Sequence, residues 1–229
     1  MKKETVLLVI LLCCTHLVFG QNTDARFLQN IQLSVLGDKQ TDSKIDISNI
    51  KGSPYLNSEF INGEVTSTNN TTINNVPLRY NIYSGEMEFE GEEKKTFYLE
   101  KSTVKNIKIG DSEFIYKIYL LNNKMSRSYF EILYHGKATL LKRYRMIFES
   151  AKPPKPYQDP VPAQFKTASP DFYIAFGDNE AKRIFSSKEL VETLPDKKAE
   201  TVAYIKKNKL KVNNQEDLIK ILQFYNSGQ

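Results

Sequence analysis

Cysteine, histidine and tryptophan are scarce in this sequence of 229 residues, which contains two cysteines, two histidines and no tryptophan. Cys13, Cys14 and His16 all lie within the first 20 residues, which have the features of a removable segment. Without that segment the chain has no cysteine for a disulfide, so an ordinary hydrophobic core must hold the fold. His135 is then the one remaining histidine, so the chain lacks the several cysteine or histidine ligands that a zinc site requires. We expect no metal and no cofactor.

Long hydrophobic runs are also missing after the first 20 residues. Residues 1–4 carry charge, residues 6–12 are apolar, and the small residue Gly20 precedes Gln21, which is the order of a secretory signal peptide. We expect cleavage between Gly20 and Gln21 and therefore an exported protein. The apolar run is far shorter than the roughly 20 residues that cross a bilayer, so we expect no transmembrane span.

The two adjacent cysteines allow another fate for this segment. A lipoprotein peptidase that cut before Cys13 or Cys14 would leave an N-terminal cysteine for acylation. Leu12 or Cys13 would then precede the cut, where a small residue is normally found. We favour cleavage before Gln21 and keep lipid anchoring at Cys13 or Cys14 as the alternative.

Charge of one sign is not concentrated anywhere in the chain. Its 32 basic and 27 acidic residues give a formal net charge of +5, and they are interleaved without a run of five or six like charges. Nucleic acids and lipid headgroups are usually bound by a basic patch or a basic helix face. We therefore expect no nucleic-acid partner.

Apolar residues alternate with polar ones along much of the stretch from residue 57 to residue 150, with turn residues between the runs. This pattern is typical of short strands that are half buried in a sheet. We predict a mainly β fold in which an antiparallel meander forms a sandwich or an open barrel, with a short C-terminal helical tail. The predicted strands of this β core are 60–66, 71–76, 78–82, 87–90, 96–99, 104–109, 114–121, 129–134 and 138–148.

The alternation changes phase near Gly85. Apolar residues in the segment 78–82 have even numbers, whereas Met87 and Phe89 have odd numbers. One extra residue between the two segments would let both face the core, and glycine accepts the backbone conformation that such a bulge needs. We predict a β-bulge at Ser84-Gly85.

Composition also changes on either side of the β core. Residues 21–56 form a polar lead-in that is broken by turn signals. Six of the nine prolines fall between residues 152 and 170, so we predict a stiff connector over residues 151–170. Residues 171–229 are expected to add one more strand and a helical tail that packs on the core, with helix starts at Ser186 and near residues 213–216.

The sequence offers little catalytic chemistry. His135 is the one base available for a hydrolytic triad after signal removal, and it precedes Gly136 at a strand break, where a solvent-exposed turn histidine is the ordinary interpretation. Glycine-rich phosphate-binding and dinucleotide-binding motifs are missing from the sequence. We predict no catalytic residue and therefore no enzyme.

Glu86, Glu88 and Glu90 alternate with Met87 and Phe89. Carboxylates at this spacing are candidates for a calcium site or for the paired acids of a glycosidase. In a strand, however, the glutamates share one face and the apolar residues share the other, which predicts a solvated acidic face. A carboxylate-dependent hydrolase therefore remains an alternative only.

Arg143 and Arg145 alternate with Tyr144 and Met146 and form a basic stripe on one strand face. The first interpretation is cross-strand pairing with the row of glutamates at 86, 88 and 90, and the second is anion binding. Tyrosines are numerous enough to line a cavity, although most are expected in the core with a solvated hydroxyl. They are Tyr80, Tyr83, Tyr116, Tyr119, Tyr129, Tyr134 and Tyr144.

Two stretches carry a resemblance to a known group of proteins. The first is VPLRYNIY at residues 76–83, followed by EMEF at 86–89, and the second is YIKKNKL at residues 204–210, followed by EDLI at 216–219. Together they resemble uncharacterised exported proteins of the Bacteroidota over most of the chain. The resemblance implies a Gram-negative cell envelope, either periplasmic or extracellular, and it implies no activity and no functional residue.

The sequence thus predicts an exported, non-enzymatic cell-envelope protein that acts as a binding or interaction domain. Its partner would be an envelope protein or an apolar ligand, and the pattern identifies no ligand-binding residues. Two alternatives remain, namely a carrier of a lipid or other apolar ligand and a carboxylate-dependent envelope hydrolase.

Overall fold

The computed structural model describes residues 50–121, 124–154, 156 and 159–227. The expected signal peptide, its cleavage site between Gly20 and Gln21, both cysteines and most of the polar lead-in lie outside the described residues. Within the described part, no helix is both long and apolar enough to cross a membrane.

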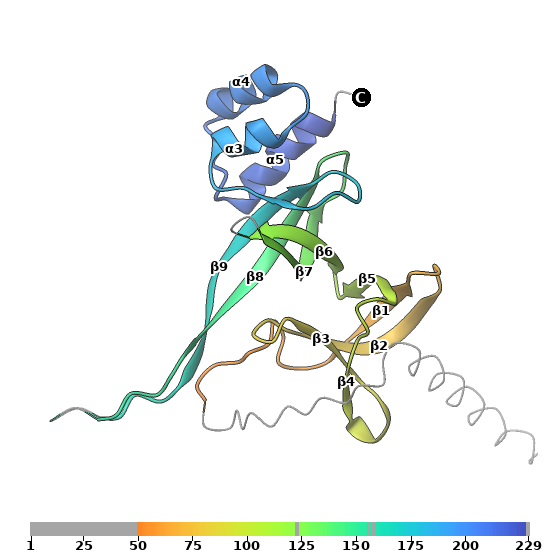
Figure 1. Cartoon of the computed structure of the whole chain (residues 1–229), viewed down its shortest axis with the longest axis vertical. Coiled ribbons are helices and arrows are strands. Elements are labelled where there is room, and N and C mark those ends of the chain that lie inside the picture. Colours follow the sequence, from red (N-terminus) through yellow and green to blue (C-terminus); the bar gives the residue numbers. More distant parts are fainter. Residues whose placement is uncertain (1–49, 122–123, 155, 157–158, 228–229) are drawn as a thin grey trace, which may run out of the picture.

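Ten strands of the described chain form one antiparallel sheet in the order β10-β9-β8-β7-β6-β5-β1-β2-β3-β4 (Figure 1). The prediction of a mainly β, antiparallel fold is confirmed, and the sheet is not closed into a barrel. Its strands are β1 (Ile61–Ser67), β2 (Thr72–Asn81), β3 (Glu86–Glu90), β4 (Thr96–Tyr98), β5 (Val104–Ile109), β6 (Ser112–Leu121), β7 (Lys124–Tyr134), β8 (Thr139–Glu149), β9 (Gln164–Ala175) and β10 (Lys182–Arg183).

The sheet consists of two meanders that meet at one non-sequential pair. β1 to β4 follow each other as hairpins, and the chain then returns so that β5 pairs with β1, with Val65 opposite Ile107. From β5 to β10 each strand again pairs with the next. In Figure 1 the first meander lies below the second, which rises toward the helices.

The first meander buries one face of its strands, as the alternation predicts. Leu78 and Tyr80 on β2 pack with Met87 and Phe89 on β3 in one apolar cluster. These side chains lie in register, since Leu78 is opposite Phe89 and Tyr80 is opposite Met87. Apolar burial on this face is the main stabilising contribution in this half of the sheet.

The strands β6, β7 and β8 are covered on both faces. On β7, Tyr129 packs into the cluster of the first meander, whereas its neighbour Phe130 belongs to a second cluster on the opposite face. Of the tyrosines expected in the core, Tyr80, Tyr119 and Tyr129 are buried, whereas Tyr83 is exposed. The second cluster contains Tyr119, Phe130, Leu141, Tyr173, Ala175 and Ala181.

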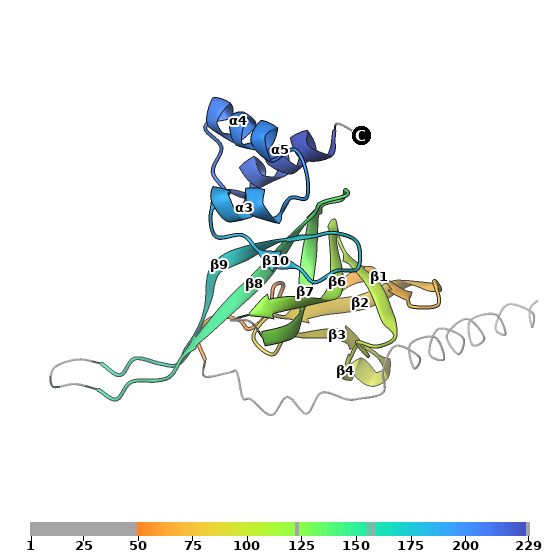
Figure 2. The ribbon, with the colours of Figure 1, turned by 45° about the horizontal axis from the view of Figure 1, so that its top comes forward.

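Three α-helices of the described chain follow β10 and cover the ends of β7 and β8 (Figure 2). The predicted helix starts are confirmed: the Ser186 hydroxyl accepts a hydrogen bond from the Glu189 N–H, and the Asn214 side chain accepts one from the Asp217 N–H. Leu218 and Leu222 pack against the sheet in a third apolar cluster, so the tail is part of the core. The helices are α3 (Ser187–Thr193), α4 (Lys198–Asn208) and α5 (Gln215–Asn226).

The bulge predicted at Ser84-Gly85 is wrong. The segments before and after it belong to two different strands, β2 and β3, which pair as a hairpin. Gly85 lies in the turn with φ +71°, and its N–H donates to the Asn81 carbonyl at 2.9 Å. The change of phase arises because the chain reverses, which brings both apolar sets to the same face.

The connector predicted over residues 151–170 is too long. β9 begins at Gln164, and its first half pairs with β8, with Phe165 opposite Phe148 and Ala168 opposite Arg145. Pro170 is tolerated because it falls where the β8–β9 register shifts, at a bulge between Arg143 and Arg145. Among the described residues between the two strands, Lys152 and Val161 form an isolated antiparallel bridge that continues the long ribbon of β8 and β9.

Candidate functional site

His135 and the glutamate row have separate contacts in the structure, since His135 contacts Glu113 whereas Glu86 contacts Lys101 and Glu88 contacts Arg79. His135 is exposed beyond the end of β7, and its Nε2 lies 2.7 Å from a carboxylate oxygen of Glu113. The interpretation of His135 as a solvent-exposed histidine at a strand break therefore agrees with its position in the structure. In the part of the chain that is described, no group of three or more histidine, aspartate or glutamate side chains is placed to hold a metal ion.

The prediction of a solvated acidic face on β3 is wrong for its central residue, Glu88. Met87 and Phe89 are buried as expected, but Glu88 is also buried, with a side chain that is 1% exposed. Arg79 on β2 lies opposite Glu88 and donates to its carboxylate at 2.7 Å. The Tyr55 ring covers one side of the Arg79 guanidinium, with the ring centroid 3.7 Å from Cζ.

The basic stripe of β8 does not pair with the glutamate row. Arg143 and Arg145 instead contact Asp171 on β9, because β8 lies beside β9, whereas β3 lies near the opposite edge of the sheet. Arg143 is directly opposite Asp171 in the β8–β9 register. Glu86, which was expected to pair with this stripe, contacts Lys101 at 2.5 Å.

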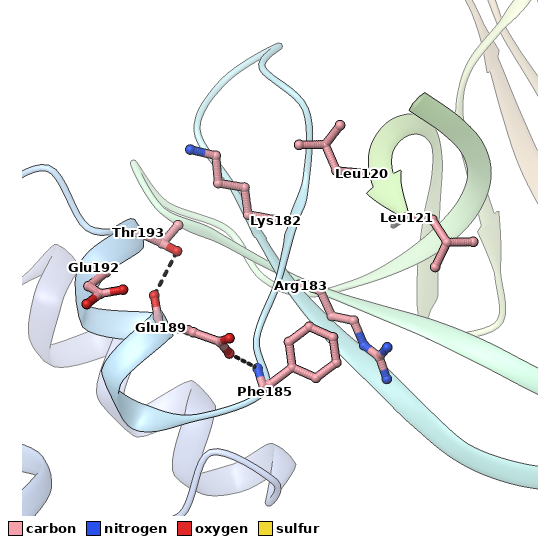
Figure 3. A pocket seen from close by; sticks show the side chains of 8 residues that line it. All are labelled: Leu120, Leu121, Lys182, Arg183, Phe185, Glu189, Glu192 and Thr193. Carbon is pink, nitrogen blue, oxygen red and sulfur yellow. Dashed lines mark hydrogen bonds between the residues drawn. The ribbon is translucent and has the colours of Figure 1, made fainter. Parts of the chain in front are cut away.

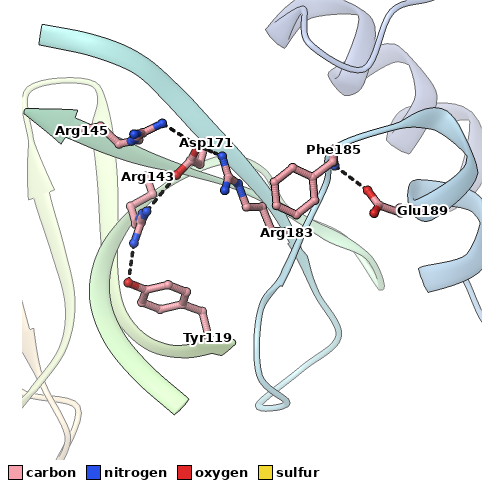
Figure 4. Close-up of polar contacts among 7 residues, drawn as sticks. All are labelled: Tyr119, Arg143, Arg145, Asp171, Arg183, Phe185 and Glu189. Atoms are coloured by element: carbon pink, nitrogen blue, oxygen red, sulfur yellow. Dashed lines mark hydrogen bonds and ion pairs between the residues drawn. The ribbon is translucent and has the colours of Figure 1, made fainter. Parts of the chain in front are cut away.

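Asp171 is the centre of an ionic cluster that brings three arginines together (Figure 4). Arg143 Nη2 donates to one carboxylate oxygen at 2.8 Å, and Arg183 Nη2 contacts the other oxygen. Arg145 Nη1 lies 3.5 Å from that second oxygen. Because the Asp171 side chain is only 3% exposed, one buried anion faces three cations, and the cluster has two positive charges in excess.

Arg143 is held between this acid and the second apolar cluster. Its guanidinium donates to the Tyr119 hydroxyl and lies 5.8 Å from the centroid of the Tyr173 ring. Burial alone would lower the pKa of Arg143, but the hydrogen bond to Asp171 and the neighbouring groups outweigh burial and raise it. Burial also raises the pKa of Tyr173 to about 12. Arg143 is therefore a permanent positive charge.

A pocket of about 530 Å³ lies beside this cluster, between the end of β6, β10 and helix α3 (Figure 3). It exists because the chain before β10 reaches across to β6, where the Ala181 N–H donates to the Ile118 carbonyl at 2.9 Å. This contact places β10 next to the last residues of β6. The lining residues are Leu120, Leu121, Lys182, Arg183, Phe185, Glu189, Glu192 and Thr193.

Phe185 is the most exposed large apolar side chain of this pocket, at 64% exposed, and Leu120 and Leu121 are each 37% exposed. The Arg183 guanidinium stacks on the Phe185 ring, and its Cζ lies 4.1 Å from the ring centroid. The backbone N–H of Phe185 donates to the Glu189 carboxylate at 3.0 Å, which anchors this position to α3. The result is a pocket with an apolar rim and a fixed aromatic ring, which we call the Phe185 pocket.

Arg183, Phe185 and Asp171 were not identified from the sequence. The sequence puts Asp171 at the border between the predicted connector and the next predicted strand, and no pattern marks β10 as a strand. The sequence predicts strands on both sides of the connector but not their register, which is what places Arg143 opposite Asp171. The position of Arg183 had no comparable signal, because β10 has only two residues.

Comparisons with protein-family models, with curated proteins and with solved structures found no match to this chain.

Proposed function

We propose that this protein is an exported, non-catalytic binding domain of the cell envelope and that the Phe185 pocket is its binding site. The signal-like N-terminus and the resemblance to exported proteins of the Bacteroidota support the envelope location. The pocket supports the binding role, because about 530 Å³ is within the size range of small-molecule sites in proteins.

One observation carries the proposal, namely that Arg183 belongs both to the ionic cluster and to the pocket. Its guanidinium contacts Asp171, stacks on Phe185 and lines the pocket. Aromatic residues, phenylalanine among them, and arginine are both enriched at the centres of protein interfaces. Arg143 and Arg145 themselves make cross-strand ion pairs, with Asp171 in place of the predicted glutamates, and Arg183 is the arginine of the cluster that lines the pocket.

A carrier of a lipid or other apolar ligand is the second candidate. Leu120, Leu121 and Phe185 give the pocket an apolar rim that would accept a hydrocarbon chain. The hydrolase alternative has less support, because the carboxylates of Glu88 and Glu86 are occupied by Arg79 and Lys101, and that of Glu189 by the Phe185 N–H.

Native mass spectrometry of the protein purified from the envelope of its own host tests the binding site. We expect the wild-type protein to retain a bound species that is lost in Phe185→Ser. Ile147→Ser is the matched control, because Ile147 is also an exposed apolar residue but lies on the β8–β9 ribbon. A wild-type protein without a bound species, or one that Phe185→Ser retains unchanged, would contradict the proposal.

N-terminal peptide mapping of the same preparation tests the location. We expect the chain to begin at Gln21. An acylated Cys13 or Cys14, or an intact Met1, would contradict export through a cleaved signal before Gln21.

A further inference from the structure

We infer that the Phe185 pocket selects a small amphiphilic carboxylate, in which an apolar body is joined to a single carboxylate group, and that Arg183 determines this selectivity. The inference rests on the proposed function, because it names the ligand class of the same pocket. It goes further by assigning the charge of the ligand and the residue that recognises that charge.

The first argument is the charge of the ionic cluster. Asp171 neutralises one of the three arginines around it, so the cluster keeps two positive charges, and one of its arginines, Arg183, lines the pocket. Side chains of Arg145 and Arg183 are 45% and 27% exposed, which places the excess charge at the protein surface rather than in the core. An anion that approaches this surface is attracted before any contact forms.

The second argument is the geometry of Arg183. A guanidinium has five N–H donors in one plane, and the contact with Asp171 uses those of Nη2. Asp171 and Phe185 hold the group from two sides, so little side-chain freedom is lost when a further acceptor binds. A carboxylate matches the fork of a guanidinium in size and planarity.

The third argument is the distribution of apolar surface. Phe185 and Leu121 lie on either side of the Arg183 side chain in the close-up view of the pocket (Figure 3). A ligand whose carboxylate contacts Arg183 can therefore place its apolar body on the Phe185 ring and the rim leucines. Removing that surface from water would supply the larger share of the affinity.

The acids of the pocket do not favour a cationic ligand. Glu189 accepts the Phe185 N–H, and this hydrogen bond lies within the wall of the pocket. Glu192 is on the same helix and its carboxylate lies 3.8 Å from the Lys188 ammonium. Lys182 lines the pocket as a further positive charge. Both acids thus already contact a donor of the protein, and the inference assigns recognition of the ligand charge to Arg183.

Three probes that share one apolar body test the inference: 4-phenylbutyrate, 4-phenylbutanol and 4-phenylbutylamine. The full chain, purified from its host and labelled with ¹⁵N, is titrated with each probe and followed by ¹H–¹⁵N NMR. We expect the carboxylate to bind at least tenfold more tightly than the alcohol, the amine to bind most weakly, and the amide signals of Leu121, Arg183 and Phe185 to shift.

Arg183→Gln should remove the preference for the carboxylate over the alcohol while the affinity for the alcohol changes less than twofold. Lys108→Gln is the matched control, since it removes one exposed positive charge on β5, and it should keep the preference. Arg183→Lys retains the charge without the planar fork and should keep part of the preference. A thermal melt of each variant shows that it is folded, and if Arg183→Gln is not, the comparison is made with Arg183→Lys.

The outcomes separate the two proposals. If the alcohol or the amine binds as tightly as the carboxylate, or if Arg183→Gln (or, where that variant is unfolded, Arg183→Lys) keeps the full preference, the inference is wrong and the pocket is still a binding site. If no probe shifts the signals of the pocket residues, the proposed binding site is itself wrong. If Lys108→Gln loses the preference as well, the selectivity comes from the net charge of the protein and the inference fails.

Discussion

Two regions of the sheet bury an acid opposite an arginine, and they differ in charge balance and in connectivity. Glu88 and Arg79 face each other within one hairpin, so one anion meets one cation. Asp171 lies on β9 between β8 and β10, which together supply three arginines. Arg79 and Glu88 are only nine residues apart, so one hairpin is enough to form their pair. The Asp171 cluster forms only after β8, β9 and β10 have assembled.

The difference separates a structural role from a binding role. Arg79 is covered by the Tyr55 ring, and its Nη1 donates to the Ser58 carbonyl at 3.2 Å, so it has contacts within the protein on several sides. Arg183 is held as firmly, but it lies beside an open pocket. A balanced buried pair mainly avoids the cost of an unpaired charge. An excess of cations beside a pocket remains available to an anion.

Neutralising Asp171 should have the largest effect on stability. Asp171→Asn keeps the shape of the side chain but leaves three arginines around an uncharged group, and we expect it to lower the free energy of unfolding by about 3–5 kcal/mol. Urea denaturation measures this change. A loss below that of Glu88→Gln would contradict the view that the three-arginine cluster depends on its single acid.

Glu88→Gln should cost less, about 2 kcal/mol, because only one buried arginine loses its counter-ion and the glutamine oxygen can still accept from it. The aromatic ring of Tyr55 also continues to stabilise the Arg79 cation. The same urea titration gives the value. Equal losses for Glu88→Gln and Asp171→Asn would show that charge balance does not distinguish the two regions.

The turn at Gly85 closes the hairpin that carries Arg79 and Glu88. Its φ of +71° is unfavourable for residues with a β-carbon, although an added Cβ would meet no atom within 4 Å. We therefore expect Gly85→Ala to cost about 1 kcal/mol and Gly85→Val about 2 kcal/mol, from backbone strain alone.

Thermal and urea melts of both variants check this expectation, with Ser84→Ala as the control that should change stability by less than about 0.5 kcal/mol. A Gly85→Val protein as stable as the wild type would mean that the turn conformation described for this hairpin is wrong.

The smallest effect is expected at Tyr173, beside the three-arginine cluster. Its hydroxyl is buried without a hydrogen-bond partner among the described residues, so Tyr173→Phe should change stability at pH 7 by less than about 0.5 kcal/mol. Because burial raises its pKa from 10 to about 12, the folded protein keeps this proton longer than the unfolded chain does. Its contribution is complete below pH 10 and is lost as pH rises toward 12.

Tyr173→Phe should therefore show a smaller loss of stability between pH 10 and 12 than the wild type. Urea titrations at several pH values in this window measure the slope. An unchanged slope would contradict burial as the cause of the raised pKa of Tyr173.

The strands of the first meander could be predicted because they bury one face. The predicted strand 104–109 coincides with β5, and the hairpin around residues 68–70 joins β1 and β2 as expected. The pairing of β5 with β1 could not be predicted from the alternation, because Val65 and Ile107 are more than 40 residues apart and any apolar strand face would fit.

The candidate site was harder to predict than the strands. Arg143 and Arg145 were recognised as a stripe, but alternation identifies the face of a side chain and not its neighbour on the next strand. The partner Asp171 depended on the β8–β9 register, and Arg183 depended on a contact between Ala181 and β6 that has no local sequence pattern. Local rules identified Arg143 and Arg145, and long-range pairing decided what they contact.

The double-sided cover of β7 has a consequence for how the molecule opens. Tyr129 and Phe130 bury their side chains on opposite faces, β6 pairs with residues 124–131 of the strand, and β8 pairs with its end at residues 131–134. No small fluctuation can free the amides near these residues, so their hydrogen exchange should require global unfolding. The amides of β4, a three-residue edge strand, need only local fraying. Slow exchange in β7 and fast exchange in β4 would show that this edge of the sheet frays before β7 opens.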